Sequence, residues 1–76
     1  MIDASLIRQL SEGIIVLRTE CGIQMWTLAK ARKARACAVC EEDIKPGDQV
    51  FRPLTNLGNR YWRIHPHCVK TLTTEL

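Results

Sequence analysis

The first apolar residues of the chain recur at helical spacing. Three of them fall at i, i+1 and i+4, which places them on one face of a helix. They are Leu6, Ile7 and Leu10. Asp3 or Ser5 can cap the start, because either side chain can accept a hydrogen bond from an otherwise orphan N–H, and Gly13 is a suitable stop. The pattern therefore predicts a short N-terminal helix.

The pattern then changes to one typical of strands. Residues 14–17 are β-branched or apolar, which favours a buried strand. Cys21 and Gly22 suit a turn, since glycine tolerates a positive φ, and residues 23–28 alternate so that a second strand could return antiparallel. One long helix from residue 3 to residue 35, broken only at the glycines, is the competing interpretation. We favour the hairpin.

Residues 28–36 combine strong helix formers with a dense positive charge. A helical turn and an extended arm both fit so short a stretch, and periodicity does not decide between them.

A second hairpin is predicted further along. Residues 49–52 form a short strand ended by Pro53, which cannot donate to a ladder. Residues 56–59 have the composition of a turn, and residues 60–64 would be the returning strand. In that strand Trp62 and Ile64 would lie in the core.

A chain of this length and composition needs stabilisation beyond that of its hydrophobic core, here called a staple. A chain of 76 residues makes one domain, and at this size only roughly 60% of the unfolded surface is buried. Such scaffolds usually add disulfides, a metal or a partner. No secretory signal is visible at the N-terminus and no stretch is long enough to span a membrane. We therefore expect a cytoplasmic protein, or a nuclear one in a eukaryote, in which four cysteines more often bind metal than form disulfides.

Two pairs of metal-ligand residues provide that staple. Cys37 and Cys40 are three apart, His65 and Cys68 are three apart, and 24 residues separate the pairs. Zinc takes four tetrahedral ligands from thiolate and imidazole, and a closed set of four is typical of a structural site. The spacing predicts one structural Zn²⁺. Pro66 suits the first turn of a helix over residues 67–72.

Cys37–Cys40 is interpreted as a zinc knuckle, a tight turn that holds two thiolates on one metal. A knuckle followed by a hairpin and then by a helix is the order of elements in a treble-clef zinc module. The predicted fold is thus a small α+β zinc-stapled domain: a helix and hairpin in residues 1–28, packed on a zinc module in residues 29–76.

Residues 29–70 resemble a poly(ADP-ribose) polymerase-type zinc finger and, less closely, half of a LIM domain. The resemblance is carried by Ala29-Lys30, the basic run, Cys-x2-Cys, Ile44, Gly47, an arginine after the strand, Trp62 and His-Pro-x-Cys. It implies a DNA-binding role and a Cys3His zinc site. The implied ligands are Cys37, Cys40, His65 and Cys68.

Spacing also favours His65 over His67 as the ligand. His65 and Cys68 can both reach one metal from the first turn of a helix, whereas His67 and Cys68 are adjacent and would diverge. His67 is therefore expected at the surface or against a partner. Cys21 is expected to be a buried small apolar residue.

Catalysis is not expected. A redox Cys-x2-Cys pair needs a βαβ setting, and no such unit fits in the chain. A hydrolytic zinc site keeps one position open for water, and four good ligands leave none.

The basic residues are the best candidates for function. Those of residues 29–36 occur without an acid among them, and three arginines of the second hairpin could extend the patch. Several phosphates could bind there, with release of counterions. The predicted nucleic-acid contacts are Lys30, Arg32, Lys33, Arg35, Arg52, Arg60 and Arg63. A merely solvated segment, or pairing of the run with the acids of residues 41–43, is the alternative. Trp26 could stack on bases, but in a chain with so few aromatics it is expected in the core.

Two functions remain open. The first is a zinc-binding module that contacts DNA or RNA. The second is a protein-interaction module or small inhibitor that docks through the N-terminal helix and hairpin, or forms a homodimer through the edge of residues 14–17.

Overall fold

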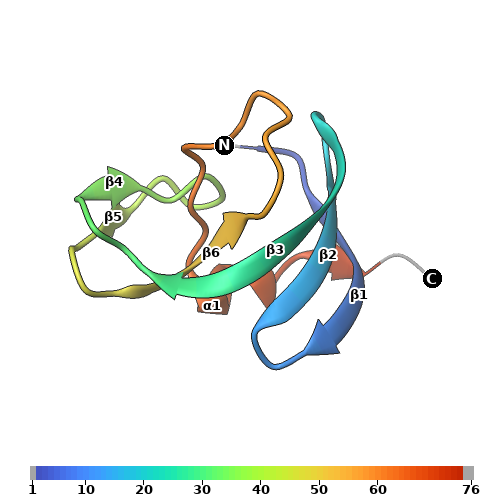
Figure 1. Ribbon diagram of the computed structural model, residues 1–76, viewed down its shortest axis with the longest axis horizontal. Helices are drawn as coiled ribbons and strands as arrows, with labels where there is room; N and C mark the ends of the chain where they lie inside the picture. Colours follow the sequence, from blue (N-terminus) through green and yellow to red (C-terminus); the bar gives the residue numbers. More distant parts are fainter. Residues whose placement is uncertain (1, 75–76) are drawn as a thin grey trace.

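A five-stranded mixed sheet dominates the structure, a computed structural model that describes residues 2–74. Its strand order is β6-β3-β2-β1-β7, and a separate two-stranded hairpin joins β4 and β5 (Figure 1). In chain order the elements are β1 (Ser5–Ser11), β2 (Ile14–Thr19), β3 (Gly22–Lys30), β4 (Arg35–Ala36), β5 (Asp43–Ile44), β6 (Gln49–Pro53), α1 (Pro66–Val69) and β7 (Thr73–Thr74). The protein is thus mostly β.

The hairpin of β2 and β3 is confirmed, and it forms the centre of the sheet. The strands pair antiparallel from Ile14 opposite Thr27 to Thr19 opposite Gly22. Gly22 has a φ of 115°, which a residue with a Cβ rarely adopts. β1 and β3 occupy both sides of β2, so the edge on which a dimer was predicted is already paired.

The predicted N-terminal helix is wrong, because those residues form β1. β1 pairs antiparallel with β2, with two irregularities of register. A helix of so few residues is marginal in water, whereas the exposed edge of β2 offers a row of unpaired backbone groups. Pairing with that edge outweighs the local preference. Gly13, predicted as a helix stop, instead lies with Glu12 in the turn between the two strands.

The basic segment is extended rather than helical. β3 continues to Lys30, a loop covers residues 31–34, and β4 leads into the first cysteine pair. Two backbone hydrogen bonds fix the loop: Ala31 donates to the Asp48 carbonyl, and Gly47 donates to the Ala31 carbonyl, each at 2.8 Å. The arm therefore has a defined path.

The predicted second hairpin is also wrong. β6 forms as expected but pairs with β3, and residues 60–64 contribute only an isolated bridge between Phe51 and Ile64. β6 pairs with the long free edge of β3, and residues 60–64, predicted as the returning strand, form a loop instead. α1 has four residues and is shorter than predicted. The α+β treble-clef prediction is therefore wrong. No helix within residues 2–74 is long and apolar enough to cross a bilayer.

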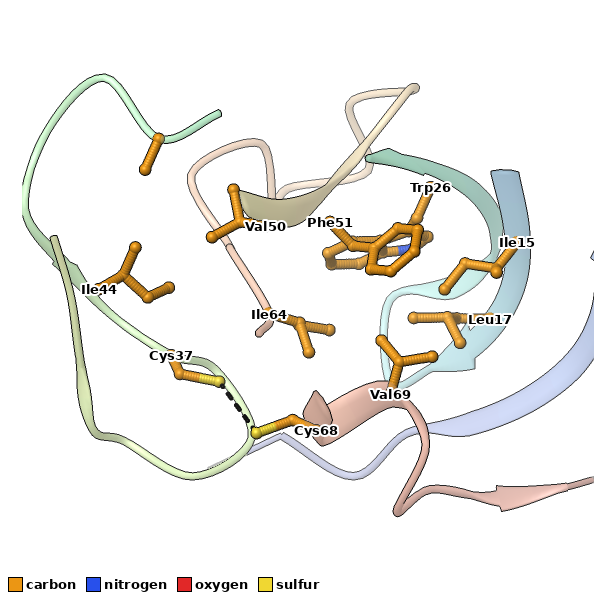
Figure 2. Close-up of a cluster of buried hydrophobic side chains, with 11 residues drawn as sticks. Ile15, Leu17, Trp26, Cys37, Ile44, Val50, Phe51, Ile64, Cys68 and Val69 are labelled. Carbon is orange, nitrogen blue, oxygen red and sulfur yellow. Dashed lines mark hydrogen bonds between the residues drawn. The ribbon is translucent and has the colours of Figure 1, made fainter. Parts of the chain in front are cut away.

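The core joins the sheet to the C-terminal segment (Figure 2). Leu17 and Trp26 of the sheet are fully buried. Ile44 of β5 and Ile64 are also fully buried. Trp26 is thus core, as expected, and its indole N–H has no hydrogen-bond partner among the described residues. Cys21 is only half-buried in the β2–β3 turn, contrary to prediction.

Candidate metal centre

The four predicted ligands converge from two parts of the chain. Cys37 follows β4 directly, and Cys40 ends a tight turn in which the Glu41 N–H donates to the Cys37 carbonyl at 2.9 Å. Glu41 closes this turn with a φ of 65°, in the left-handed region. His65 caps α1 and Cys68 lies within it. The two halves are joined by the Ala38 N–H, which donates to the Arg63 carbonyl at 2.9 Å.

The donor atoms form a cluster that can hold one metal ion. The three Sγ atoms and a His65 ring nitrogen all lie within 4.8 Å of one another. Cys37 and Cys68 are 1% and 4% exposed, while Cys40 and His65 are half-buried. All four cysteines of the chain are free thiols.

The distances fit the zinc donor set. Two sulfurs on one tetrahedral zinc lie about 3.8 Å apart, given Zn–S bonds of about 2.3 Å; the Cys37 and Cys68 Sγ atoms are 3.8 Å apart (Figure 2). A sulfur and an imidazole nitrogen on the same ion lie about 3.5 Å apart; Cys40 Sγ and His65 Nδ1 are 3.5 Å apart. Cys68 Sγ is 3.9 Å from the same nitrogen. Four protein donors would complete the coordination, as in structural zinc sites.

The surroundings act in opposite directions on two of the thiols. Burial raises the pKa of Cys37, but hydrogen bonds from the backbone N–H groups of Cys40, His65 and Val39 outweigh burial and lower this pKa to about 6. Burial, together with the hydrogen bonds and charges of Cys40 and Cys37, raises the pKa of Cys68 to about 12. The surroundings thus favour the thiolate form of Cys37 and the thiol form of Cys68.

Zinc affinity is expected to fall at least about tenfold for each unit by which the pH is lowered from 8 to 6. Zinc binds the thiolate, and the raised pKa of Cys68 means that its proton leaves only on binding. At least one proton is therefore released per zinc, and more protons oppose binding as the pH falls. The sign is the same for an unfolded metal-free chain, since an ordinary cysteine thiol is also protonated below about pH 8.

Competition with a chromophoric chelator of known pH dependence measures this slope. An affinity that does not change between pH 8 and pH 6 would contradict the assignment of thiolate ligands.

His67 lies outside the donor cluster, in agreement with the spacing argument. Its ring stacks on that of His65, with centroids 4.8 Å apart and planes at 18°, and the residue is exposed. His67 therefore lies beside the candidate ligand His65 and outside the donor set.

Most of the predicted basic contacts surround one hollow of about 750 Å³, here called the basic hollow. Six of the seven predicted residues line it, together with Ala29, Ala31 and Gly47. The six are Lys30, Arg32, Lys33, Arg35, Arg52 and Arg63. Burial, and then the charges of Arg35 and Arg52, lower the pKa of Arg63. Arg60 is not part of the lining; its guanidinium lies over the Tyr61 ring, 4.6 Å from the centroid.

Tyr61 is a further candidate, which the sequence pattern did not single out. Tyr61 is 59% exposed, and the Arg35 guanidinium of the basic hollow lies 5.5 Å from its ring centroid. Its position between Arg60 and Arg63 in the sequence was the available indication.

Comparisons with protein-family models, with known proteins and with solved structures find no match. The Cys3His cluster is therefore the part of the family resemblance that the structure shows.

Proposed function

We infer that this protein is a non-enzymatic zinc-binding module that contacts nucleic acid through the basic hollow. One observation carries the proposal: six cationic side chains from three separate stretches line a single concavity. No acidic residue occurs among the described residues of that lining. Cations held this close repel one another, and phosphate groups would relieve the repulsion and release counterions.

The metal cluster and the basic hollow draw residues from the same two segments of the chain. Arg35 lies two residues before Cys37, and Arg63 lies two residues before His65. The hydrogen bond between Ala38 and Arg63 ties the same two segments together. A bound zinc would therefore fix the distance between two walls of the basic hollow. The basic hollow carries the proposal without the family resemblance, since the treble-clef fold predicted for residues 29–76 is not the fold observed.

Replacing Arg32 and Lys33 together by alanine is expected to weaken nucleic-acid binding roughly tenfold to fiftyfold at 0.1 M salt. Both residues are exposed and line the basic hollow, so their loss removes phosphate contacts without disturbing the core. The slope of log K against log salt should fall by about 1.4 to 1.8, which corresponds to two lost contacts. Fluorescence anisotropy with labelled oligonucleotides, at several salt concentrations, measures both quantities.

The matched control is Arg8→Ala with Lys70→Ala. It changes the formal charge by the same amount, from +3 to +1 (3 − 2 = 1). Both residues are exposed and neither lines the basic hollow; Arg8 is on β1, at the opposite end of the molecule from β4 in Figure 1. The control should bind within about twofold of the wild type, since a net-charge effect alone is screened. Absence of binding to any oligonucleotide at 50 mM salt, or equal losses in both variants, would refute the proposal.

A second candidate function is contact with a protein, and an exposed apolar patch favours it. Ile23 and Met25 of β3 are 53% and 45% exposed, and Leu54 and Leu57 are each 46% exposed. The Leu54 N–H donates to the Met25 carbonyl at 2.9 Å, which places Leu54 beside β3, and the Leu57 side chain lies near Gly22 at the start of the same strand. The predicted docking face was the N-terminal helix together with the hairpin; the helix does not form, and the patch includes β3 of that hairpin. A partner, or a second copy of the chain, bound there would be held by apolar contacts and would resist salt, unlike nucleic acid in the basic hollow.

A further inference from the structure

The ring of Tyr61 is the aromatic surface that this chain presents to solvent. Of the four aromatic side chains, Trp26 is fully buried, Phe51 is 6% exposed, and Trp62 is half-buried against the core. Tyr61, at 59% exposed, is the exception. An exposed ring among cations has no part in the core, so its position calls for another explanation.

The backbone holds Tyr61 outward. Asn59, which begins the turn, is 1% exposed and bonded to Gln24 of β3, and the Trp62 N–H donates to the Asn59 carbonyl at 2.9 Å. Arg63 closes the turn, since its Nη1 donates to the Arg60 carbonyl at 2.9 Å. The ring is therefore displayed on a braced turn.

The ring also lies at the rim of the basic hollow. Arg35 belongs to both: it lines the hollow, its Nη1 donates to the Tyr61 carbonyl at 3.4 Å, and its guanidinium lies 5.5 Å from the ring centroid. Arg60 covers the ring at 4.6 Å and hydrogen-bonds the Tyr61 hydroxyl. Cations and an aromatic face thus form one continuous surface.

This surface is suited to a separated strand and not to a duplex. Proteins that read a duplex insert a projecting helix or ribbon into a groove, whereas here the cations line a concavity of about 750 Å³. The helix α1 has four residues and buries Cys68 and Val69. In a duplex the base faces are stacked on one another and cannot meet Tyr61, but in a single strand they are free.

We propose that the basic hollow binds single-stranded nucleic acid, with phosphates among its cations and one base stacked on Tyr61. The inference rests on the proposed function and deepens it. Arg35 binds a phosphate next to the stacked base. Arg60 is exposed, and its guanidinium turns from the ring to the backbone of the strand as the base takes its place. Every base has a stacking face, so the site tolerates many sequences.

The test compares a labelled 12-nucleotide single strand with its own duplex by fluorescence anisotropy at 0.1 M salt. The single strand is expected to bind at least about tenfold more tightly. Tyr61→Ala should weaken single-strand binding about tenfold, the loss typical of one stacked base, with no change in the salt slope. Tyr61→Phe keeps the ring and should bind within about twofold of the wild type. Zinc content and thermal midpoint are measured for each variant.

The outcomes separate this inference from the function on which it rests. Duplex binding equal to or tighter than single-strand binding, lost in the Arg32/Lys33 variant, overturns the inference and leaves the proposed function standing. A Tyr61→Ala variant that binds like the wild type has the same meaning, since no base would then stack on the ring. A Tyr61→Ala variant whose salt slope falls also overturns the inference, because the ring would then act only by positioning arginines that contact phosphates. Failure to bind either oligonucleotide overturns both. Polyglutamate of equal length bound as tightly as the single strand also overturns both, since it offers no base to stack.

Discussion

Replacement of Cys68 by serine is expected to abolish zinc binding and the cooperative unfolding transition. Cys68 is 4% exposed, and its Sγ lies 3.8 Å from that of Cys37, so serine would leave a buried three-donor set. Structural zinc contributes roughly 10–16 kcal/mol in small zinc domains. The whole stability of a chain this long is about 4–11 kcal/mol. Loss of the metal therefore exceeds what the rest of the fold can supply.

Loss of the zinc should unfold the five-stranded sheet as well as the turn of Cys37 and Cys40. Val69 follows Cys68 in α1 and packs beside Ile15 and Leu17 of β2 (Figure 2). Ile64 precedes the ligand His65, and its backbone exchanges two hydrogen bonds with Phe51 of β6. Without the metal, the segments that carry Val69 and Ile64 are no longer held in place, and both side chains can leave the core. We therefore expect one unfolding event and not a surviving independent sheet.

Native mass spectrometry, thermal unfolding and tryptophan fluorescence measure these effects, because Trp26 reports directly on the sheet core. Cys21→Ser is the matched control. Cys21 is the cysteine outside the cluster and is half-buried in the β2–β3 turn, so its replacement should keep one zinc and cost less than about 1 kcal/mol. A strong chelator should reproduce the Cys68→Ser phenotype in the wild type. A zinc-free protein that still unfolds cooperatively near the wild-type midpoint would contradict the assignment.

The sequence was sufficient where the chemistry is local. The ligand pairs are recognisable because each is a short spacing beside a turn, and the structure brings all four donors together. The β2–β3 hairpin is equally local: residues 14–17 are β-branched or apolar, and Gly22 is a glycine at a position of positive φ. In these segments neighbouring residues decide the conformation.

The sequence was insufficient where a distant partner decides. The periodicity of residues 5–11 suits a helix, but the open edge of β2 takes the segment as a strand. β6 is predicted from its own composition, yet it pairs along its length with β3, which precedes it by 19 residues at Lys30 and Gln49, and it makes only an isolated bridge with the segment that follows. A wrong partner for β6 produced the treble-clef interpretation. The partner of a strand depends on which sheet edges remain free, and the hydrophobic periodicity of a segment contains no information about those edges.

The role of Asn59 belongs to the same class, and it leads to the second large effect. Composition marks Asn59 as a turn residue, yet it is 1% exposed, and it faces Gln24 of β3, which is 3% exposed. The two amides bond reciprocally: Asn59 Nδ2 donates to Gln24 Oε1 at 2.7 Å, and Gln24 Nε2 donates to Asn59 Oδ1 at 3.1 Å. Gln24 Nε2 also donates to the Thr55 carbonyl at 2.6 Å. The pair ties the loop that carries Tyr61 to the central sheet.

Asn59→Ala should therefore destabilise the protein by about 2–4 kcal/mol, since it leaves the buried Gln24 carbonyl oxygen without its Asn59 donor. For a domain of this size that corresponds to a fall of roughly 10–25 °C in the thermal midpoint. Asn56→Ala is the control: Asn56 is exposed, and its Oδ1 accepts from the Gly58 N–H of its own turn at 3.0 Å. It should cost less than about 1 kcal/mol.

A double replacement distinguishes a lost amide pair from a simple loss of volume. Replacing Gln24 and Asn59 together by leucine removes both polar groups, so neither is left buried without a partner. The double variant should be more stable than the sum of the two single leucine replacements predicts, by at least about 1 kcal/mol of coupling. Strict additivity in denaturant unfolding would show that the amides do not act as a pair. Because the Trp62 N–H donates to the Asn59 carbonyl next to Tyr61, Asn59→Ala should also weaken oligonucleotide binding, even at temperatures where the zinc site is intact.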